Sequence, residues 1–281
     1  MRARFPFRRF MVAVLLLCAG MQAVSAAPTA TVPLQVSSQR TTSMAVWEPE
    51  MVRGVVLFSH GDGAWPERYD ALLQTWRDAG FAVVAPLHVD SMRHPDRETF
   101  SLQQGFGERM ADMKAASAYA AARWPGVTMA AAGHSYGTLV SLALGGALSG
   151  LAPLRDPRVS AVVGYSSPGR IPGLVTPSSY ASVAVPVLLV TGDKDFVPGF
   201  VGDPRDHLYP VQTAPAGDKY AVVLSGGDHN LIGGQPEALY LRARDIGTAF
   251  LKAELLKDAE AARMLSADAA GPADAERWIR R

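Results

Sequence analysis

Three short stretches of the sequence carry residue types that together could perform nucleophilic catalysis. They are the glycine-flanked Ser135, the acidic turn Asp193-Lys194-Asp195, and His229, in this order along the chain. A serine hydroxyl is a weak nucleophile unless a histidine removes its proton and a carboxylate orients that histidine. The order serine, acid, histidine therefore indicates a covalent mechanism in which the serine attacks the substrate.

The serine lies in the pattern Gly-x-Ser-x-Gly, in a turn over 133–137 between an apolar strand predicted over 128–132 and an apolar helix that runs to Leu144. A serine on such a tight turn adopts strained backbone angles. The residues two positions before and two positions after it must be glycine, because a β-carbon there would collide with nearby elements. The turn exposes the hydroxyl at the positive end of the helix, where a developing oxyanion is stabilised. The alternative is a glycine-rich turn whose serine has no chemical role.

Strands alternate with helices along the chain, which indicates an α/β fold with a mostly parallel central sheet and helices on both faces. The strands are predicted over 31–36, 43–47, 52–59, 81–86, 128–132, 159–165, 185–191 and 220–224, and the helices over 66–79, 108–124, 138–144 and 236–256. The first two strands contain polar residues and are predicted at the sheet edge, whereas 52–59 reads as a buried strand. The serine, the acid and the histidine each follow a strand.

The segments outside these elements predict an open site. The stretch 88–106 is a polar loop, and 166–184 is rich in proline, glycine and serine. The second segment is too short for a large helical cap. Residues 258–281 are alanine- and charge-rich and are predicted to form a peripheral helix and a loose end that carries Trp278.

Composition limits the possible partners. The chain has 281 residues, 48% of them hydrophobic, and a formal net charge of +1. This length and hydrophobic content suffice for one full core. No basic stripe remains beyond the first nine residues, so a nucleic-acid partner is not expected.

The first 27 residues resemble a secretory signal peptide. Four arginines fall within the first nine positions, an apolar run covers 11–17, and small residues suitable for cleavage cover 24–27. We therefore expect a periplasmic or secreted protein whose main domain is 28–257, with no stable membrane anchor after cleavage. Retention of the segment as an anchor is the alternative.

The single cysteine, Cys18, lies inside this leader. Lipidation there is disfavoured because Leu17, which is not a small residue, precedes it. The mature chain then has no disulfide, no cysteine nucleophile and no thiolate metal site.

The three motifs together resemble the α/β-hydrolase family, in its esterase-like branch with platelet-activating-factor acetylhydrolase-like, chlorophyllase-like and dienelactone-hydrolase-like proteins. The resemblance covers about Val52 to Leu256. It implies an α/β-hydrolase fold without a large cap, a small-molecule ester substrate, no cofactor and no metal. By position, it implies Ser135 as nucleophile, His229 as base and Asp195 as the acid, with Asp193 as the competing choice for the acid.

The same resemblance implies an oxyanion hole built from two backbone N–H groups. One is that of Tyr136, the residue after the nucleophile. The other is that of Asp62, because the stretch 59–63 resembles the family's H-G-x-G turn. An acidic residue departs from the apolar one common in relatives. Its side chain either disfavours anionic substrates or points to solvent.

The remaining histidines are predicted to be structural or solvated. His60 and His134 adjoin glycine turns, where histidines commonly bond to loop backbone. Two loop groups contain metal-ligand residue types but no recognised ligand spacing, so we expect solvated loop residues there. These groups are His88, Asp90 and His94, and Asp203, Asp206 and His207.

The predicted activity is hydrolysis of a carboxylic ester through an acyl-enzyme. Thioesters, amides and polyesters remain open as substrates because the loops 88–106 and 196–219 would decide among them. A catalytically silent binding protein of the same fold is the alternative from another functional class. The sequence does not indicate an oligomeric state.

Overall fold

The structure is a computed structural model that describes residues 27–270 and 276–281. The predicted signal peptide thus lies, except for Ala27, outside the described residues, and it stays a prediction. No helix in the described part of the chain is long and apolar enough to cross a membrane.

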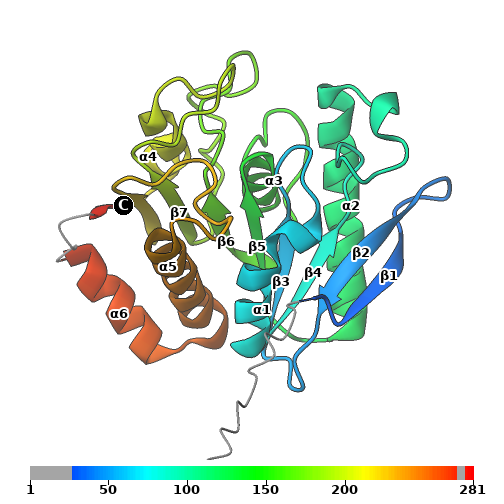
Figure 1. The fold of residues 1–281 in the computed structure, drawn as a ribbon, viewed down its shortest axis with the longest axis horizontal. Coiled ribbons are helices and arrows are strands. Elements are labelled where there is room, and N and C mark those ends of the chain that lie inside the picture. The colour runs from blue at the N-terminus through cyan, green and yellow to red at the C-terminus, as the bar shows by residue number, and fades with distance from the viewer. Residues whose placement is uncertain (1–26, 271–275) are drawn as a thin grey trace, which may run out of the picture.

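The described residues build one nine-stranded sheet in the order β1-β2-β4-β3-β5-β6-β7-β8-β9 (Figure 1). The strands are β1 (Ala30–Gln35), β2 (Thr41–Trp47), β3 (Gly54–Ser59), β4 (Phe81–Pro86), β5 (Met129–His134), β6 (Val159–Tyr165), β7 (Val187–Gly192), β8 (Lys219–Leu224) and β9 (Glu276–Arg280). The strands from β4 to β8 in this order are parallel, while β1, β2 and β9 are antiparallel to their neighbours.

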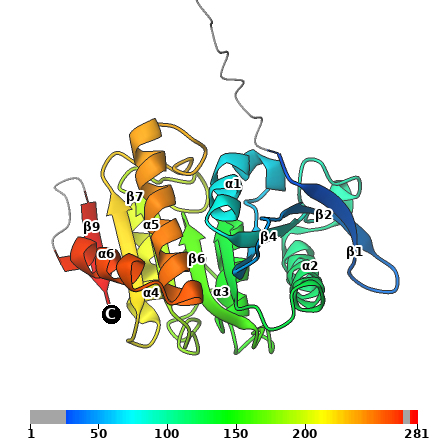
Figure 2. The ribbon, with the colours of Figure 1, turned by 90° about the horizontal axis from the view of Figure 1, so that it is seen from below.

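Helices cover both faces of the sheet, as Figure 2 shows from below. They are α1 (Asp70–Asp78), α2 (Leu102–Arg123), α3 (Tyr136–Leu144), α4 (Tyr209–Thr213), α5 (Glu237–Leu256) and α6 (Ala259–Ala270), with short 3₁₀ turns η1 (Pro66–Tyr69), η2 (Arg97–Thr99) and η3 (Pro204–Leu208). The predicted α/β fold with a mostly parallel sheet is confirmed.

Two hydrophobic cores lie on opposite faces because side chains alternate along each strand. In β3, Val55 and Leu57 pack into the core under α2 and α3. Val56 and Phe58 pack into the other core, under α1 and α5. All six residues of β3 are buried, which explains its continuous apolar sequence.

No helix or strand lies between the end of β6 and the start of β7, a stretch that the structure describes throughout. The expectation of no large cap is confirmed at this position. The β6–β7 connection is therefore an irregular loop and places no helical cap over the carboxyl ends of the parallel strands.

The long helix α2 begins earlier than predicted. It starts at Leu102 instead of about Glu108, and Ser101 caps it. The Ser101 hydroxyl accepts the N–H of Gln104, whose side chain in turn accepts the Ser101 N–H. The two glycines at 105 and 107 gave this turn the composition of a loop, but the capping box and tertiary packing outweigh their low helix propensity.

The C-terminal segment also differs from the prediction. The peripheral helix is present as α6, but the expected loose end is a strand, since β9 pairs with β8 and places Trp278 opposite Val222. Arg242 of α5 binds the Glu276 carboxylate at 2.5 and 2.9 Å. β2 was also predicted at the edge, yet it lies inside the sheet, between β1 and β4. These pairings depend on long-range contacts that local composition does not reveal.

Candidate active site

The turn that carries Ser135 has the strained geometry predicted for it. Ser135 has φ 53° and ψ −120°, which is costly for a residue with a β-carbon. A β-carbon built on Gly133 would lie 2.3 Å from the carbonyl oxygen of Gly137, and one built on Gly137 would lie 1.9 Å from the carbonyl oxygen of Ser59. Both glycines are required because β5, α3 and β3 approach so closely.

Ser135, His229 and Asp195 form a continuous chain of hydrogen bonds. The Nε2 atom of His229 lies 3.0 Å from Ser135 Oγ, and its Nδ1 atom lies 2.8 Å from Asp195 Oδ1. Ser135 follows β5, Asp195 follows β7 and His229 follows β8, so the parallel sheet brings the three together at the carboxyl ends of its strands. Donation from Nδ1 to the carboxylate leaves Nε2 able to accept the serine proton.

Asp195 is fully buried, and both of its carboxylate oxygens accept hydrogen bonds. Its Oδ1 faces His229, and its Oδ2 accepts the hydroxyl of Thr191 at 2.8 Å. Burial opposes ionisation of this carboxyl, but hydrogen bonds from His207 and His229 outweigh it and hold the pKa of Asp195 well below its ordinary value. Asp195 is therefore a carboxylate.

A second imidazole, that of His207, binds the same carboxylate. Its Nε2 lies 3.1 Å from Asp195 Oδ1 and 2.8 Å from the Asp195 carbonyl oxygen, and its Nδ1 contacts the carbonyl oxygen of Ser167. All three partners are acceptors, and a neutral imidazole has only one N–H to donate. His207 is thus an imidazolium. Burial lowers its pKa, but the hydrogen bond and charge of Asp195 outweigh burial and raise the pKa above its usual value.

The other aspartates near the histidine have different partners. Asp193 accepts the N–H of Gly226 at 2.7 Å and the hydroxyl of Ser225 at 3.2 Å. Asp228 accepts the N–H of Asn230 at 2.9 Å and so shapes the turn. Of the two aspartates that the sequence left open, Asp195 is the one in contact with His229.

The two predicted oxyanion donors flank the serine. A β-carbon built on Gly61 would lie 3.6 Å from Ser135 Cβ, so the turn after β3 packs directly against the nucleophile. The N–H of Asp62 meets no acceptor among the described residues. Tyr136 is the first residue of α3, where backbone N–H groups point out of the helix end.

The carboxyl group of Asp62 lies close to that of Asp90. Burial first, and then the interaction with Asp90, raise the pKa of Asp62 above its ordinary value. Asp62 is exposed overall, in agreement with the alternative that its side chain points to solvent. The expectation that it disfavours anionic substrates stays a prediction.

His134 and His60 hold the surrounding backbone, as predicted. His134 Nε2 lies 2.9 Å from the carbonyl oxygen of His229, and its Nδ1 lies 2.9 Å from the hydroxyl of Tyr69. His60 Nδ1 bonds the Gly61 carbonyl at 2.8 Å. Burial, then the neighbouring His229, lower the pKa of His134 to about 3, so its ring is neutral.

The two loop groups do not form metal sites, since no cluster of three ligand residues exists in the described part of the chain. The expectation that they are solvated is wrong for three histidines, because His88, His94 and His207 are all buried. His88 bonds Ser59 Oγ and Asp112 Oδ2, each at 2.9 Å. Sequence reasoning missed these partners because they come from other elements.

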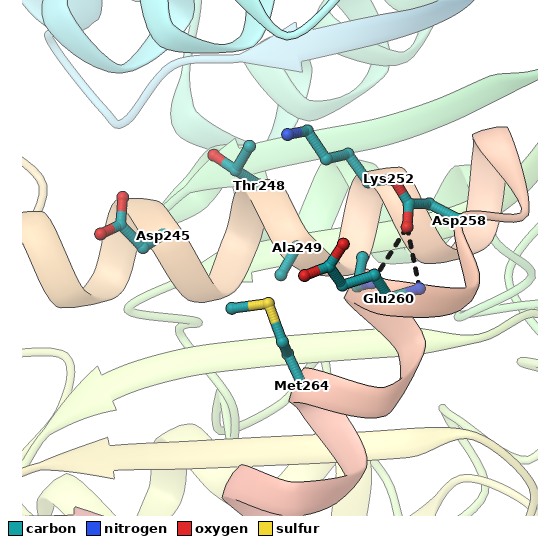
Figure 3. Close-up of a pocket in the computed structure, with 8 residues that line it drawn as sticks. Asp245, Thr248, Ala249, Lys252, Asp258, Glu260 and Met264 are labelled. Carbon is teal, nitrogen blue, oxygen red and sulfur yellow. Dashed lines mark hydrogen bonds between the residues drawn. The ribbon is translucent and has the colours of Figure 1, made fainter.

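Two surface hollows among the described residues lie away from the triad. The larger, of about 340 Å³, lies between α5 and α6 (Figure 3). Asp258 forms its end and accepts the N–H groups of Glu260 and Ala261, which caps α6. The other, of about 230 Å³, adjoins Asp193, Asp203 and Arg277. Neither is lined by Ser135 or His229.

No family model matches the chain. No curated protein matches it either. Solved structures do match, which allows a comparison of the fold.

Three such structures share most of the fold. A soluble variant of monoglyceride lipase from Saccharomyces cerevisiae matches with a TM-score of 0.64 and 14% identity, over 81% of this chain and 96% of that one. An α/β serine hydrolase homologue from Coxiella burnetii has a TM-score of 0.58 and 18% identity, over 78% and 97%. A cold-adapted esterase from an Arctic intertidal metagenomic library has a TM-score of 0.58 and 17% identity, over 80% and 93%. The chain has the α/β-hydrolase fold.

Proposed function

We propose that this protein is a serine hydrolase that cleaves carboxylic esters through an acyl-enzyme. The observation that carries the proposal is the unbroken hydrogen-bond chain from Ser135 through His229 to the buried Asp195. A hydroxyl, an imidazole and a carboxylate in this arrangement form a nucleophile with its general base.

In the first half of the reaction, Ser135 Oγ attacks the ester carbonyl carbon while His229 Nε2 takes the hydroxyl proton. Asp195 stabilises the imidazolium that forms. The N–H groups of Asp62 and Tyr136 donate to the carbonyl oxygen as it becomes an oxyanion. His229 then gives its proton to the departing alcohol, which leaves an acyl group on Ser135.

In the second half, water replaces the alcohol. His229 removes a proton from this water, the hydroxide attacks the acyl carbonyl, and the same two N–H groups stabilise the second oxyanion. Collapse of this intermediate releases the acid and returns the proton from His229 to Ser135. The cycle uses only groups of the chain and water.

The choice of an ester rests on the structural relatives, which include a lipase and an esterase by name. The uncapped β6–β7 connection supports a site open to small acyl groups. Thioesters, amides and polyesters would be cleaved by the same groups and are the competing substrates.

The proposal is tested by hydrolysis of p-nitrophenyl esters from acetyl to palmitoyl, with Ser135→Ala measured beside the wild type. We expect turnover to be highest with short acyl chains and to fall by about 10⁴-fold or more in the variant, which loses its nucleophile. Near-wild-type turnover in a folded Ser135→Ala variant would refute the assignment.

A further inference from the structure

We propose that Arg109, on α2, is a positioning residue that holds both halves of the oxyanion hole in place. This inference rests on the proposed function, because it concerns the two N–H groups assigned above to Asp62 and Tyr136. No motif in the sequence singles out Arg109, whose guanidinium bonds the backbone of the turn after β3 and has no hydrogen bond to Ser135 or His229 among the described residues.

The guanidinium of Arg109 is fully buried and fixed by an ion pair. Its side chain has 0% exposure, and it binds Asp90 with two parallel hydrogen bonds, Nε to Oδ1 at 2.7 Å and Nη2 to Oδ2 at 2.5 Å. Burial opposes ionisation of Asp90, but Arg109 holds the pKa of Asp90 well below its ordinary value. A bidentate pair of this kind fixes both the position and the plane of the guanidinium.

The remaining donors of this guanidinium bind the turn after β3, and Nη1 also donates to the hydroxyl oxygen of Ser59 at 3.4 Å. Nη1 donates to the carbonyl oxygen of His60 at 2.6 Å, and Nη2 donates to that of Gly61 at 3.1 Å. In a trans peptide the C=O and N–H bonds point in opposite directions. Holding the Gly61 carbonyl behind the turn therefore directs the Asp62 N–H to the front, where Gly61 packs against Ser135.

The preceding peptide is held at both ends. Its carbonyl, from His60, is bound by Arg109, and its N–H, from Gly61, donates to the Tyr69 hydroxyl at 3.1 Å. The two successive peptides are thus oriented in opposite ways. The His60–Gly61 peptide directs its N–H toward Tyr69 inside the protein, and the Gly61–Asp62 peptide directs its N–H outward. Arg109 therefore binds both carbonyls of the turn, and the Gly61 carbonyl also accepts hydrogen bonds from His60 Nδ1 at 2.8 Å and from the Ala64 N–H at 3.2 Å.

Arg109 also contacts the residue that supplies the second donor. Its guanidinium carbon lies 4.5 Å from the centre of the Tyr136 ring, within the range of a cation–π interaction. The turn after β3 and the start of α3 are thus tied to one rigid group. A lysine would keep the charge opposite Asp90 but could not bind two carbonyls, a carboxylate and a ring together.

The test compares wild type with Arg109→Lys on p-nitrophenyl acetate and on the matching thionoester. Sulfur accepts hydrogen bonds poorly, so a thionoester gains little from an oxyanion hole. We expect kcat for the ester to fall by about 100-fold, the thionoester rate to fall much less, and KM to change little. An equal fall for both substrates, or an ester kcat within about twofold of wild type, would overturn the proposal.

A matched control and a second variant separate positioning from folding. Arg40 binds Glu108 and Asp112 on the same helix but no carbonyl of the turn. Arg40→Lys should therefore leave the ratio of ester to thionoester rates unchanged. If Arg109→Lys does not fold, the double variant Arg109→Met and Asp90→Asn removes the two charges together. It should lower the ratio of the ester rate to the thionoester rate to the same extent.

Amide hydrogen exchange keeps this test independent of the proposed function. Replacement of the Arg109 guanidinium by a lysine ammonium should speed hydrogen exchange of the Gly61 N–H, while exchange of the N–H groups in β5 stays unchanged. Unaltered exchange at Gly61 in a folded Arg109→Lys variant would overturn the positioning role even if the protein hydrolyses no ester. A wild type that neither turns over esters nor reacts with a fluorophosphonate would instead refute the proposed function.

Discussion

Three histidines at this site have the same side chain but different chemical states, and their neighbours decide which. His134 meets a tyrosine hydroxyl and a carbonyl in a buried position and stays neutral. His207 meets only acceptors and is an imidazolium. His229 has one nitrogen on a carboxylate and the other on a hydroxyl, which suits a base that must gain and lose a proton.

The charge on His207 should set the pH range of activity. A cation beside Asp195 partly cancels the negative charge that stabilises the imidazolium of His229. We predict that His207→Gln, which removes this cation, moves the acidic limb of the kcat/KM profile to higher pH. The titratable groups that face His207 from other elements in the described part of the chain are Asp195 and His229.

The control for this prediction is His94→Gln. His94 is also a buried loop histidine, but its Nδ1 accepts only a backbone N–H, that of Asp96. Its replacement should leave the acidic limb in place. An unchanged or acid-shifted limb in His207→Gln would contradict the charge assigned to His207.

At the scale of elements, the crossing of β5, α3 and β3 is a tight steric constraint on the chain. Gly137 has no room for a β-carbon, because the nearest backbone oxygen would lie 1.9 Å away. The glycines of α2 are different. Gly107 is exposed in a helix interior, and a β-carbon there would meet nothing within 4 Å.

These two glycines therefore predict opposite effects of the same substitution. Gly107→Ala should raise the free energy of unfolding by about 0.5–1 kcal/mol, because alanine loses less backbone entropy in a helix. Gly137→Ala should lower it by at least about 3 kcal/mol or prevent folding, because the backbone of β3 must move. Urea unfolding measures both, and a Gly137→Ala variant as stable as wild type would contradict the described crossing.

Most elements could be predicted from the sequence because their signals are local. The buried strands have continuous apolar runs, and the Gly-x-Ser-x-Gly turn follows from sterics within a few residues. The start of α2 and the pairing of β9 could not be predicted. A helix cap with two following glycines resembles a loop, and pairing at a sheet edge depends on a partner strand far along the chain.

The candidate active site likewise has residues that the sequence predicts and residues that it does not. The order of Ser135, Asp195 and His229 could be predicted, because each follows a strand of a parallel sheet. The roles of Arg109 and His207 could not. Each acts through partners on other elements, and their residue types and spacing carry no signal of those contacts.

At the scale of the whole molecule, buried neutral histidines should make stability depend on pH. Burial lowers the pKa of His134 to about 3, and it also lowers those of His60 and His88. In the unfolded chain a histidine binds a proton below about pH 6.5. The unfolded state then binds more protons than the native state, so each such histidine costs stability as pH falls from about 6.5 toward its native pKa.

A difference measurement isolates this effect for His134. Burial raises the pKa of Asp112 to about 6, which acts in the opposite sense, so wild type alone is not diagnostic. We predict that His134→Gln is less stable than wild type at about pH 7.5, and that this gap shrinks by up to about 2 kcal/mol at about pH 5. Urea unfolding at both pH values provides the comparison. A gap that stays constant or widens would contradict a neutral His134.

The central claim is that Ser135 becomes covalently acylated during turnover. The most direct test is to mix the purified protein with p-nitrophenyl acetate, quench in acid within the first turnovers, and map the acetyl group by peptide mass spectrometry. We predict acetylation of the peptide that contains Ser135, and none in Ser135→Ala. Steady ester turnover with no acetyl group on Ser135, or with the group on another residue, would contradict it.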